Sequence, residues 1–184
     1  YGKIHLPFLI LLKLKKISMV SREETNKISH IYKNIFISDY DKASDMEGIY
    51  KNNIKAVLYL GSCEKPQIIL DIYKFKNINY RFIKIQDSDT ADLRSCFKYV
   101  WDFINEQSKK KNNIIIHCRR GVSRSPSAVA YFLMKVMHIY MKEKNEIHPI
   151  LDDVLTLIHN NRPCIHPNKN FIKQLKLYEK KNIK

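Results

Sequence analysis

The sequence NIIIHCRRGVSRSPSAVAYFL, residues 113–133, decides how this chain folds. It begins with a short β-branched run, Asn113–Ile116, which is typical of a buried strand. The residues from Ser125 onward favour a helix, because serine suits the cap position and Pro126 suits the first turn. Gly121 allows a sharp bend between the two. The stretch therefore predicts a strand, a tight loop and a helix whose N-terminus presents unpaired N–H groups and a positive dipole end to an anion.

Cys118 and Arg124 lie six positions apart across this loop. A helix N-terminus with nearby cations can lower the pKa of a thiol by ~1–5 units. Cys118 is therefore predicted to be a thiolate near neutral pH and to attack phosphorus, forming a phospho-cysteine. The planar guanidinium of Arg124 matches two phosphate oxygens and is predicted to hold the phosphate. The alternative, a buried cysteine that only fills space, leaves the other loop residues unexplained.

The remaining loop residues are expected to complete the phosphate site. Ser125 is placed to donate a hydrogen bond to the sulfur, and His117 to orient the loop rather than to move protons. The phosphate is expected to contact the segment between them, which consists of Arg119, Arg120, Gly121, Val122, Ser123 and Arg124. For Arg120 two positions remain open. Inside the pocket it would favour multiply phosphorylated substrates; at its rim, the position we favour, it would change little.

A phosphate ester also needs an acid that protonates its leaving oxygen. The segment Ile83–Leu93 offers three carboxylates for this role. Asp87 directly follows a predicted strand with alternating apolar residues. Asp92 precedes a helical apolar stripe, so we interpret it as a cap or first-turn residue. Asp89 lies between them and stays open, and position alone favours Asp87 only slightly over a solvated loop acid.

Three blocks of the sequence resemble the dual-specificity phosphatases of the cysteine-based protein tyrosine phosphatase superfamily. They are the loop His117–Ser125, the segment Ile83–Phe97 and the segment Arg162–Phe171. The resemblance extends from about Lys27 to Tyr178. It implies that Asp87 is the general acid and that the chain is a protein phosphatase that needs no metal and no cofactor.

Two features depart from that family. Arg120 stands where members more often carry a small or apolar residue, so the loop is unusually basic. The stretch from Met134 to Arg162 is longer than usual, and we expect the additional residues in His138–Glu146, as a helix extension or a surface loop.

At 184 residues the chain is expected to form one domain with a substantial core. We assign residues 27–182 to a catalytic domain and residues 1–26 to an N-terminal extension. The apolar run Leu6–Leu12 in this extension is too short to span a bilayer, and lysines follow it, unlike the order in a signal peptide. The extension could contact a membrane, but we favour packing on the domain or a frayed tail.

Composition limits the partners and the compartment. Four cysteines without paired spacing indicate a reducing environment, so we expect a cytoplasmic, or else nuclear, protein. The formal net charge of +15 could reflect affinity for nucleic acid, anionic lipid or phosphorylated substrates, but we favour the interpretation that it is simply a lysine-rich surface. No nucleic-acid-binding motif is present, and His159, Cys164 and His166 are interpreted as incidental rather than as zinc ligands. We therefore expect no nucleic-acid partner and no metal.

Strands are predicted at residues 34–38, 54–60, 80–85 and 113–117, and helices at 41–51, 66–73, 93–109, 125–140, 149–159 and 168–180. This alternation predicts an α/β fold with a central, mainly parallel sheet of four to five strands and helices on both faces. The loop after residue 117 then lies at the carboxyl end of a central strand, where such sheets bind ligands.

Three functions fit the pattern. The first is a phosphatase acting on phosphotyrosine and phosphoserine or phosphothreonine in proteins, because no segment resembles the aromatic loop that deepens the pocket of tyrosine-specific enzymes. The second is a phosphatase for phosphoinositides or other polyanions, suggested by Arg119 and Arg120. The third, a phosphoprotein-binding module without turnover, is disfavoured because nucleophile, arginine and acid are all present. Cys63 could trap an oxidised Cys118 as a disulfide, although a structural role is the more frequent one.

Overall fold

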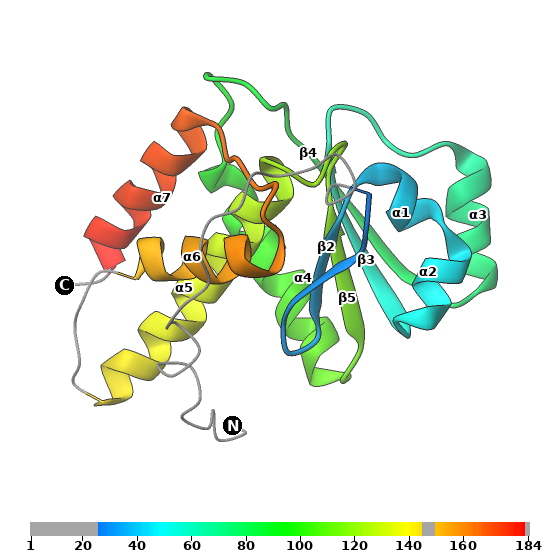
Figure 1. Ribbon diagram of the computed structural model, residues 1–184, viewed down its shortest axis with the longest axis horizontal. Coiled ribbons are helices and arrows are strands. Elements are labelled where there is room, and N and C mark those ends of the chain that lie inside the picture. Colours follow the sequence, from blue (N-terminus) through cyan, green and yellow to red (C-terminus); the bar gives the residue numbers. More distant parts are fainter. Residues whose placement is uncertain (1–25, 145–149, 183–184) are drawn as a thin grey trace.

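The computed structural model describes residues 26–144 and 150–182. At its centre is a five-stranded sheet with the strand order β1-β2-β5-β3-β4 (Figure 1). The strands are β1 (Ser29–Tyr32), β2 (Ile35–Ser38), β3 (Ile54–Gly61), β4 (Asn79–Lys84) and β5 (Asn113–His117). Strands β2, β5, β3 and β4 are parallel, and β1 pairs with β2 in the antiparallel direction. The predicted mainly parallel sheet is confirmed.

Helices cover both faces of this sheet, as predicted (Figure 1). One face carries α1 (Tyr40–Ser44), α2 (Met46–Lys51) and α3 (Gln67–Phe75). The other carries α4 (Phe97–Lys109), α5 (Arg124–Lys144) and α6 (Leu151–Asn161), with α7 (Lys169–Asn182) packed on α5 and α6. None of the helices in the described ranges is long and apolar enough to cross a membrane.

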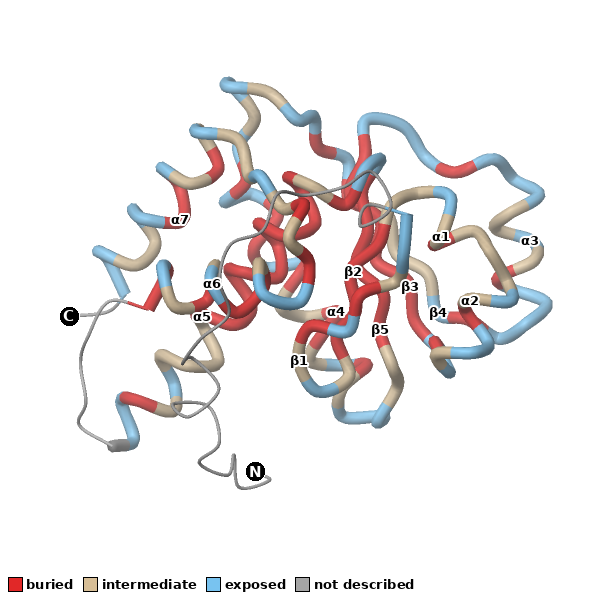
Figure 2. The backbone as a smooth tube through the Cα atoms, in the orientation of Figure 1, coloured by how far each residue is buried: buried red, intermediate tan, exposed pale blue. Residues whose placement is uncertain are grey.

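The side chains of β5 show how the sheet divides the core in two. Ile114 and Ile116 belong to the core shared with α4 to α7, whereas Ile115 belongs to the core shared with α1 to α3, and all three are wholly buried. A continuous β-branched run is what a strand buried on both faces requires. Figure 2 shows the buried segments running along the sheet and the inner sides of its helices.

One local prediction is wrong, and one strand was missed. The helix predicted over residues 41–51 is two helices, because Asp45 takes an extended conformation (φ −78°, ψ 106°) and caps α2 by accepting a hydrogen bond from the Glu47 amide at 3.1 Å. Asp39 caps α1 in the same way, accepting from the Lys42 amide at 2.8 Å. Strand β1 was not predicted, since its four residues lack a clear alternation of their own and pair only with β2.

Helix boundaries also shift at the functional end of the chain. A 3₁₀ turn, η2 (Arg94–Cys96), precedes α4, and α5 begins at Arg124, so Ser125 lies inside the helix rather than at its cap. The additional residues expected at 138–146 continue α5 as far as Lys144. Residues 145–146 and nearly all of the N-terminal extension, residues 1–25, lie outside the described residues.

The four parallel strands end at one edge of the sheet. Their last residues are Ser38, Gly61, Lys84 and His117, and β5 lies between β2 and β3. The pairing register sets His117 beside Ser38 on one side and beside Tyr59 on the other. The loop that follows His117 is therefore flanked by the segments that follow β2 and β3.

Candidate active site

Cys118 is the first residue after β5, at the base of the loop, and is 2% exposed. Burial alone would raise the pKa of its thiol. That effect is outweighed by hydrogen bonds from the Ser125 hydroxyl, at 3.4 Å from the sulfur, and from the Ser125 and Val122 amides, together with the charge of Arg124. The net direction is a lowered pKa, so the sulfur is a thiolate at lower pH than an ordinary cysteine.

His117 is wholly buried behind the loop. Its Nδ1 lies 3.3 Å from the carbonyl oxygen of Cys118, and its ring stacks on Tyr59 with centroids 4.6 Å apart. Burial, the charge of Lys65 and the charge of Arg124 lower the pKa of His117 well below its ordinary value. A neutral ring with its proton on Nδ1 can donate to the Cys118 carbonyl, which orients the start of the loop.

Arg124 is the first residue of α5 and is 8% exposed. Its Nη1 donates to the carbonyl of Ile85 at 3.3 Å, and its Nε lies 3.8 Å from Oδ2 of Asp87. That distance is an ion-pair contact but too long for a hydrogen bond, and Nε has no hydrogen-bond partner among the described residues. A buried guanidinium with donors to spare suits an incoming anion.

Asp87 is held beside Arg124 by two other segments. Its Oδ1 accepts hydrogen bonds from the Ser123 hydroxyl and from Nδ2 of Asn168, both at 2.7 Å. The other carboxylates of the predicted acid segment are placed differently. Asp92 accepts a hydrogen bond from the amide of Arg94, the first residue of η2, at 3.0 Å, although the cap position of η2 is Leu93. Asp89 is an exposed residue that lines a hollow together with Asp87.

The shape of the loop depends on a residue that sequence reasoning did not assign to the site, Arg162. This side chain is wholly buried at the end of α6. Its Nε donates to the carbonyl of Gly121 at 2.9 Å and its Nη2 to that of Arg120 at 3.3 Å, while Nη1 donates to the Ser29 hydroxyl at 3.1 Å. Asn168 was missed as well. Both residues stand in the segment Arg162–Phe171, and the resemblance of that segment to the phosphatase family was the signal available in the sequence.

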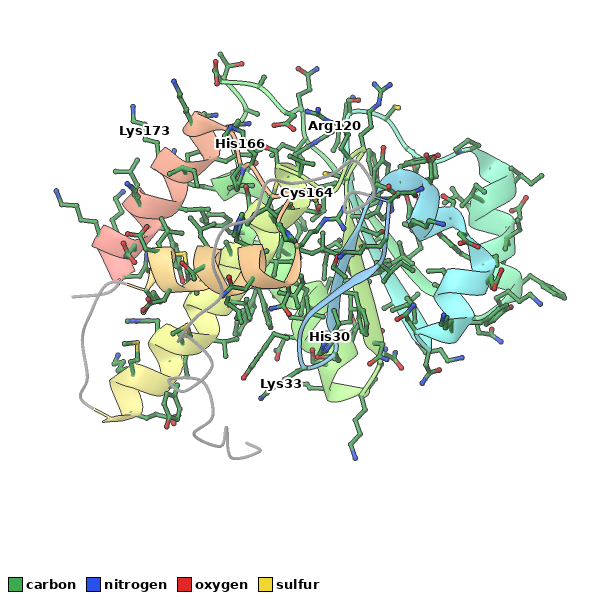
Figure 3. The ribbon with its side chains drawn as sticks, in the orientation of Figure 1. His30, Lys33, Arg120, Cys164, His166 and Lys173 are labelled. Carbon is green, nitrogen blue, oxygen red and sulfur yellow. The ribbon has the colours of Figure 1, made fainter. Side chains whose placement is uncertain are left out.

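Two hollows flank the loop, and they share Arg119, Arg120 and Arg124. One, of about 740 Å³, is walled by the segments after β2 and β3; the other, of about 710 Å³, is walled by the Asp87 segment and the turn before α7. Arg119 and Arg120 are exposed. Arg120, which is labelled in Figure 3, lines both hollows with an exposed side chain.

The cysteines and histidines outside the loop form no metal centre in the described part of the chain, where no group of three or more His, Cys, Asp and Glu could hold an ion. Cys63 is exposed and lines the larger hollow together with Arg124, whereas Cys96 is buried. A bridge between Cys63 and an oxidised Cys118 stays a prediction.

A family model described as the dual specificity phosphatase catalytic domain matches residues 35–181. The chain belongs to this family and is a protein phosphatase, a hydrolase of phosphoric monoesters. Dual specificity protein phosphatase 22 of Xenopus tropicalis is 28% identical over 158 residues, covering 86% of this chain and 68% of that protein. A probable rhodanese domain-containing dual specificity protein phosphatase of Dictyostelium discoideum is 33% identical, but the match covers 68% of this chain and 28% of that protein.

Solved structures share the fold. DUSP15 aligns with a TM-score of 0.71 at 22% identity, covering 83% of this chain and 87% of that one. A putative mouse dual specificity phosphatase complexed with zinc tungstate aligns with a TM-score of 0.70 at 16% identity, covering 92% and 94%. At these identities the likeness supports the fold alone.

The left-handed conformation of Gly121 (φ 67°) gives a first prediction. A methyl group there would lie 2.4 Å from the Ser38 carbonyl oxygen and 2.5 Å from Nη2 of Arg162. We expect Gly121→Ala to lower the free energy of unfolding by ~1–3 kcal/mol and to abolish most activity in the fraction that stays folded. Urea unfolding and an aryl phosphatase assay measure the two effects. Gly48→Ala in α2 is the matched control, and equal activity of the two variants would contradict the prediction.

The lowered pKa of Cys118 gives a second prediction. Its rate of alkylation by iodoacetamide should rise with pH through a midpoint below that of an ordinary thiol. Ser125→Ala removes one of the donors that oppose the effect of burial, so the midpoint should move to higher pH. Ser127→Ala removes a hydroxyl that bonds to the Ser123 carbonyl instead, at 2.8 Å, and should leave the midpoint in place. A midpoint that does not move in Ser125→Ala contradicts the account.

Proposed function

We propose that Cys118 is the nucleophile with which this phosphatase removes phosphate from tyrosine, serine and threonine side chains of proteins. The observation that carries the proposal is the set of donors directed at one buried sulfur: the Ser125 hydroxyl and the amides of Ser125 and Val122, with Arg124 alongside. A thiolate stabilised in this way is available for attack near neutral pH.

In the first step the thiolate attacks phosphorus, the bond between phosphorus and the leaving oxygen breaks, and a phospho-cysteine forms. Arg124 binds two of the non-bridging oxygens, and loop amides bind the third. Asp87 gives its proton to the leaving oxygen. Because Oδ1 of Asp87 already accepts two hydrogen bonds, Oδ2 is the oxygen that carries this proton.

In the second step water attacks the phospho-cysteine. Asp87, now a carboxylate, takes a proton from that water, and the phosphorus–sulfur bond breaks to return the thiolate and release inorganic phosphate. The Ser125 hydroxyl, 3.4 Å from the sulfur, stabilises the charge that develops on the departing atom. Each group is thereby restored for the next turnover.

The surroundings of the loop support a broad choice of phosphorylated side chains. The hollows beside it are open, with the exposed Arg119 and Arg120 at their shared rim. An open site admits the short side chains of phosphoserine and phosphothreonine, and Tyr40 on one wall offers a ring to phosphotyrosine. A relative from Dictyostelium discoideum, 33% identical over 79% of this chain, is named a MAP kinase phosphatase, so a phosphorylated kinase is the first protein to test.

Replacement of the nucleophile tests the covalent route. Cys118→Ser exchanges a thiolate for a hydroxyl that stays protonated near neutral pH, so hydrolysis should fall by several orders of magnitude while phosphopeptide binding survives. Steady-state assays without added metal, with calorimetry of phosphopeptide binding, measure both. If more than a few per cent of the activity remains, the phospho-cysteine proposal is wrong.

The loss of activity caused by replacing Asp87 should depend on the substrate. Asp87→Asn should lose ~10²–10⁴-fold in kcat on a phosphoserine or phosphotyrosine peptide, since the leaving oxygen then receives no proton. The loss should be much smaller on an activated aryl phosphate, whose leaving group departs without one. Asp89→Asn, on the wall of the same hollow, is the comparison. Equal losses on both substrates, or a larger loss in Asp89→Asn, would assign the acid elsewhere.

A further inference from the structure

A buried cation lies next to the loop 118–124, which we call the active loop. The cation has no role in the two phosphatase steps described under the proposed function. Lys65 stands between β3 and α3, and the residue is 4% exposed. Lysine is almost never buried to this extent without partners. Its Nζ donates to the Ser44 hydroxyl at 2.8 Å and faces two aromatic rings, 3.6 Å from the centroid of Tyr40 and 5.4 Å from that of Tyr59. These are cation–π distances.

The two rings connect this cation to the nucleophile. Tyr59 stacks on His117, the residue before Cys118, with centroids 4.6 Å apart and planes 9° apart. Tyr40 meets both rings edge-on, at 5.7 Å from Tyr59 and 6.0 Å from His117. The backbone amide of Tyr40 also donates to the carbonyl of Arg119 at 3.1 Å. We call Lys65, Tyr40, Tyr59 and His117 the aromatic column.

Gly61, near the end of β3, leaves the space that the Tyr59 ring occupies. A Cβ atom added to Gly61 would lie 2.3 Å from the ring of Tyr59. Tyr59 can therefore lie over His117 only because the residue two positions later in the strand has no side chain. A side chain at position 61 would therefore displace the Tyr59 ring from its place over His117.

We propose that Lys65 is a positioning residue of the phosphatase, whose buried ammonium clamps Tyr40 and Tyr59 against His117 and so fixes the junction between β5 and the loop that carries Cys118. The inference rests on the proposed role of Cys118 as the nucleophile. The segment after β3 would then help to position the nucleophile, a role that neither the active loop nor Asp87 fills.

The charge of Lys65 acts on the same junction. It adds to burial in lowering the pKa of His117, which keeps the imidazole neutral and able to donate from Nδ1 to the Cys118 carbonyl. Burial lowers the pKa of Lys65 itself to about 8, and Asp41 in α1 opposes that shift. Tyr40 in α1 and Tyr59 in β3 face the ammonium, and Cys63 lies near both of these tyrosines. Tyr80 in β4 interacts with Glu64 and the Lys65 backbone, while Tyr73 in α3 contacts Ser44, the hydrogen-bond partner of Lys65.

A pH dependence follows. Below pH 8 the ammonium is charged and the column is clamped; above it the side chain loses its proton and the cation–π contacts, while Cys118 remains a thiolate. The turnover of an activated aryl phosphate, which does not need the acid, should therefore decline as the pH rises past about 8. His117, with its lowered pKa, stays neutral on both sides of this change and does not contribute to it.

The experiment compares pH profiles of kcat on an activated aryl phosphate. Lys65→Met should lower kcat by ~10–100-fold with little change in KM, because a misplaced nucleophile affects the chemical step more than binding. Lys65→Arg keeps a cation at all working pH values, so the alkaline decline should move to higher pH. Ser44→Ala removes the hydrogen bond to the ammonium, so the decline should move to lower pH. Lys55→Met, an exposed lysine in β3, is the matched control and should behave as the wild type.

Circular dichroism separates misfolding from misplacement. If Lys65→Met fails to fold, the opposite shifts expected for Lys65→Arg and Ser44→Ala still decide the question, and declines that stay at the wild-type pH in both would overturn the proposal. A folded Lys65→Met with wild-type kcat would overturn it too. The failure of the phospho-cysteine mechanism has a different signature, which is activity that survives in Cys118→Ser.

Discussion

The buried guanidinium of Arg162 is the contact on which the arrangement of the site depends. It donates to the carbonyls of Gly121 and Arg120 on one side and to Ser29 and the carbonyl of Lys27 on the other. These groups come from the active loop and from the start of the sheet. Carbonyl groups turned away from an anion site would otherwise be buried without donors, at a cost of ~1–3 kcal/mol each. Because the Arg162 side chain binds these loop carbonyls, the loop amides can point toward the phosphate.

A hydrogen-bonded chain through Ser123 couples the acid to the same loop. The Ser123 hydroxyl donates to Asp87 at 2.7 Å and accepts from the Asn168 amide at 3.1 Å, while the Asn168 side chain donates to the same carboxylate oxygen. The acid segment, the active loop and the turn before α7 thus meet at one oxygen atom. A shift in any of them moves the proton donor relative to the sulfur, so the position of the acid depends on three segments that lie far apart in sequence.

The positive charges near Cys118 are of two kinds. The buried charge acts on the thiol, and the exposed charges act on the substrate. Arg124, 8% exposed, is among the groups that lower the pKa of Cys118, together with amides and a hydroxyl at its sulfur. Arg119 and Arg120 are exposed, where water and salt screen a charge within ~8–10 Å. The whole chain carries a formal net charge of +15. It can attract a phosphorylated protein, whereas the acidity of the thiol is set within the loop.

The strand, loop and helix around Cys118 could be predicted because their determinants are local: a β-branched run, a glycine and a proline within twenty residues. The split at Asp45 could not, since the same residues suit one amphipathic helix and only the cap contact with Glu47 distinguishes the two. The roles of Arg162 and Lys65 could not be predicted from the sequence either. Their partners lie up to 135 and 25 positions away, and an arginine or lysine in a lysine-rich chain is read as surface unless burial is known. The residues that hold the nucleophile in place are for this reason harder to predict than the nucleophile itself.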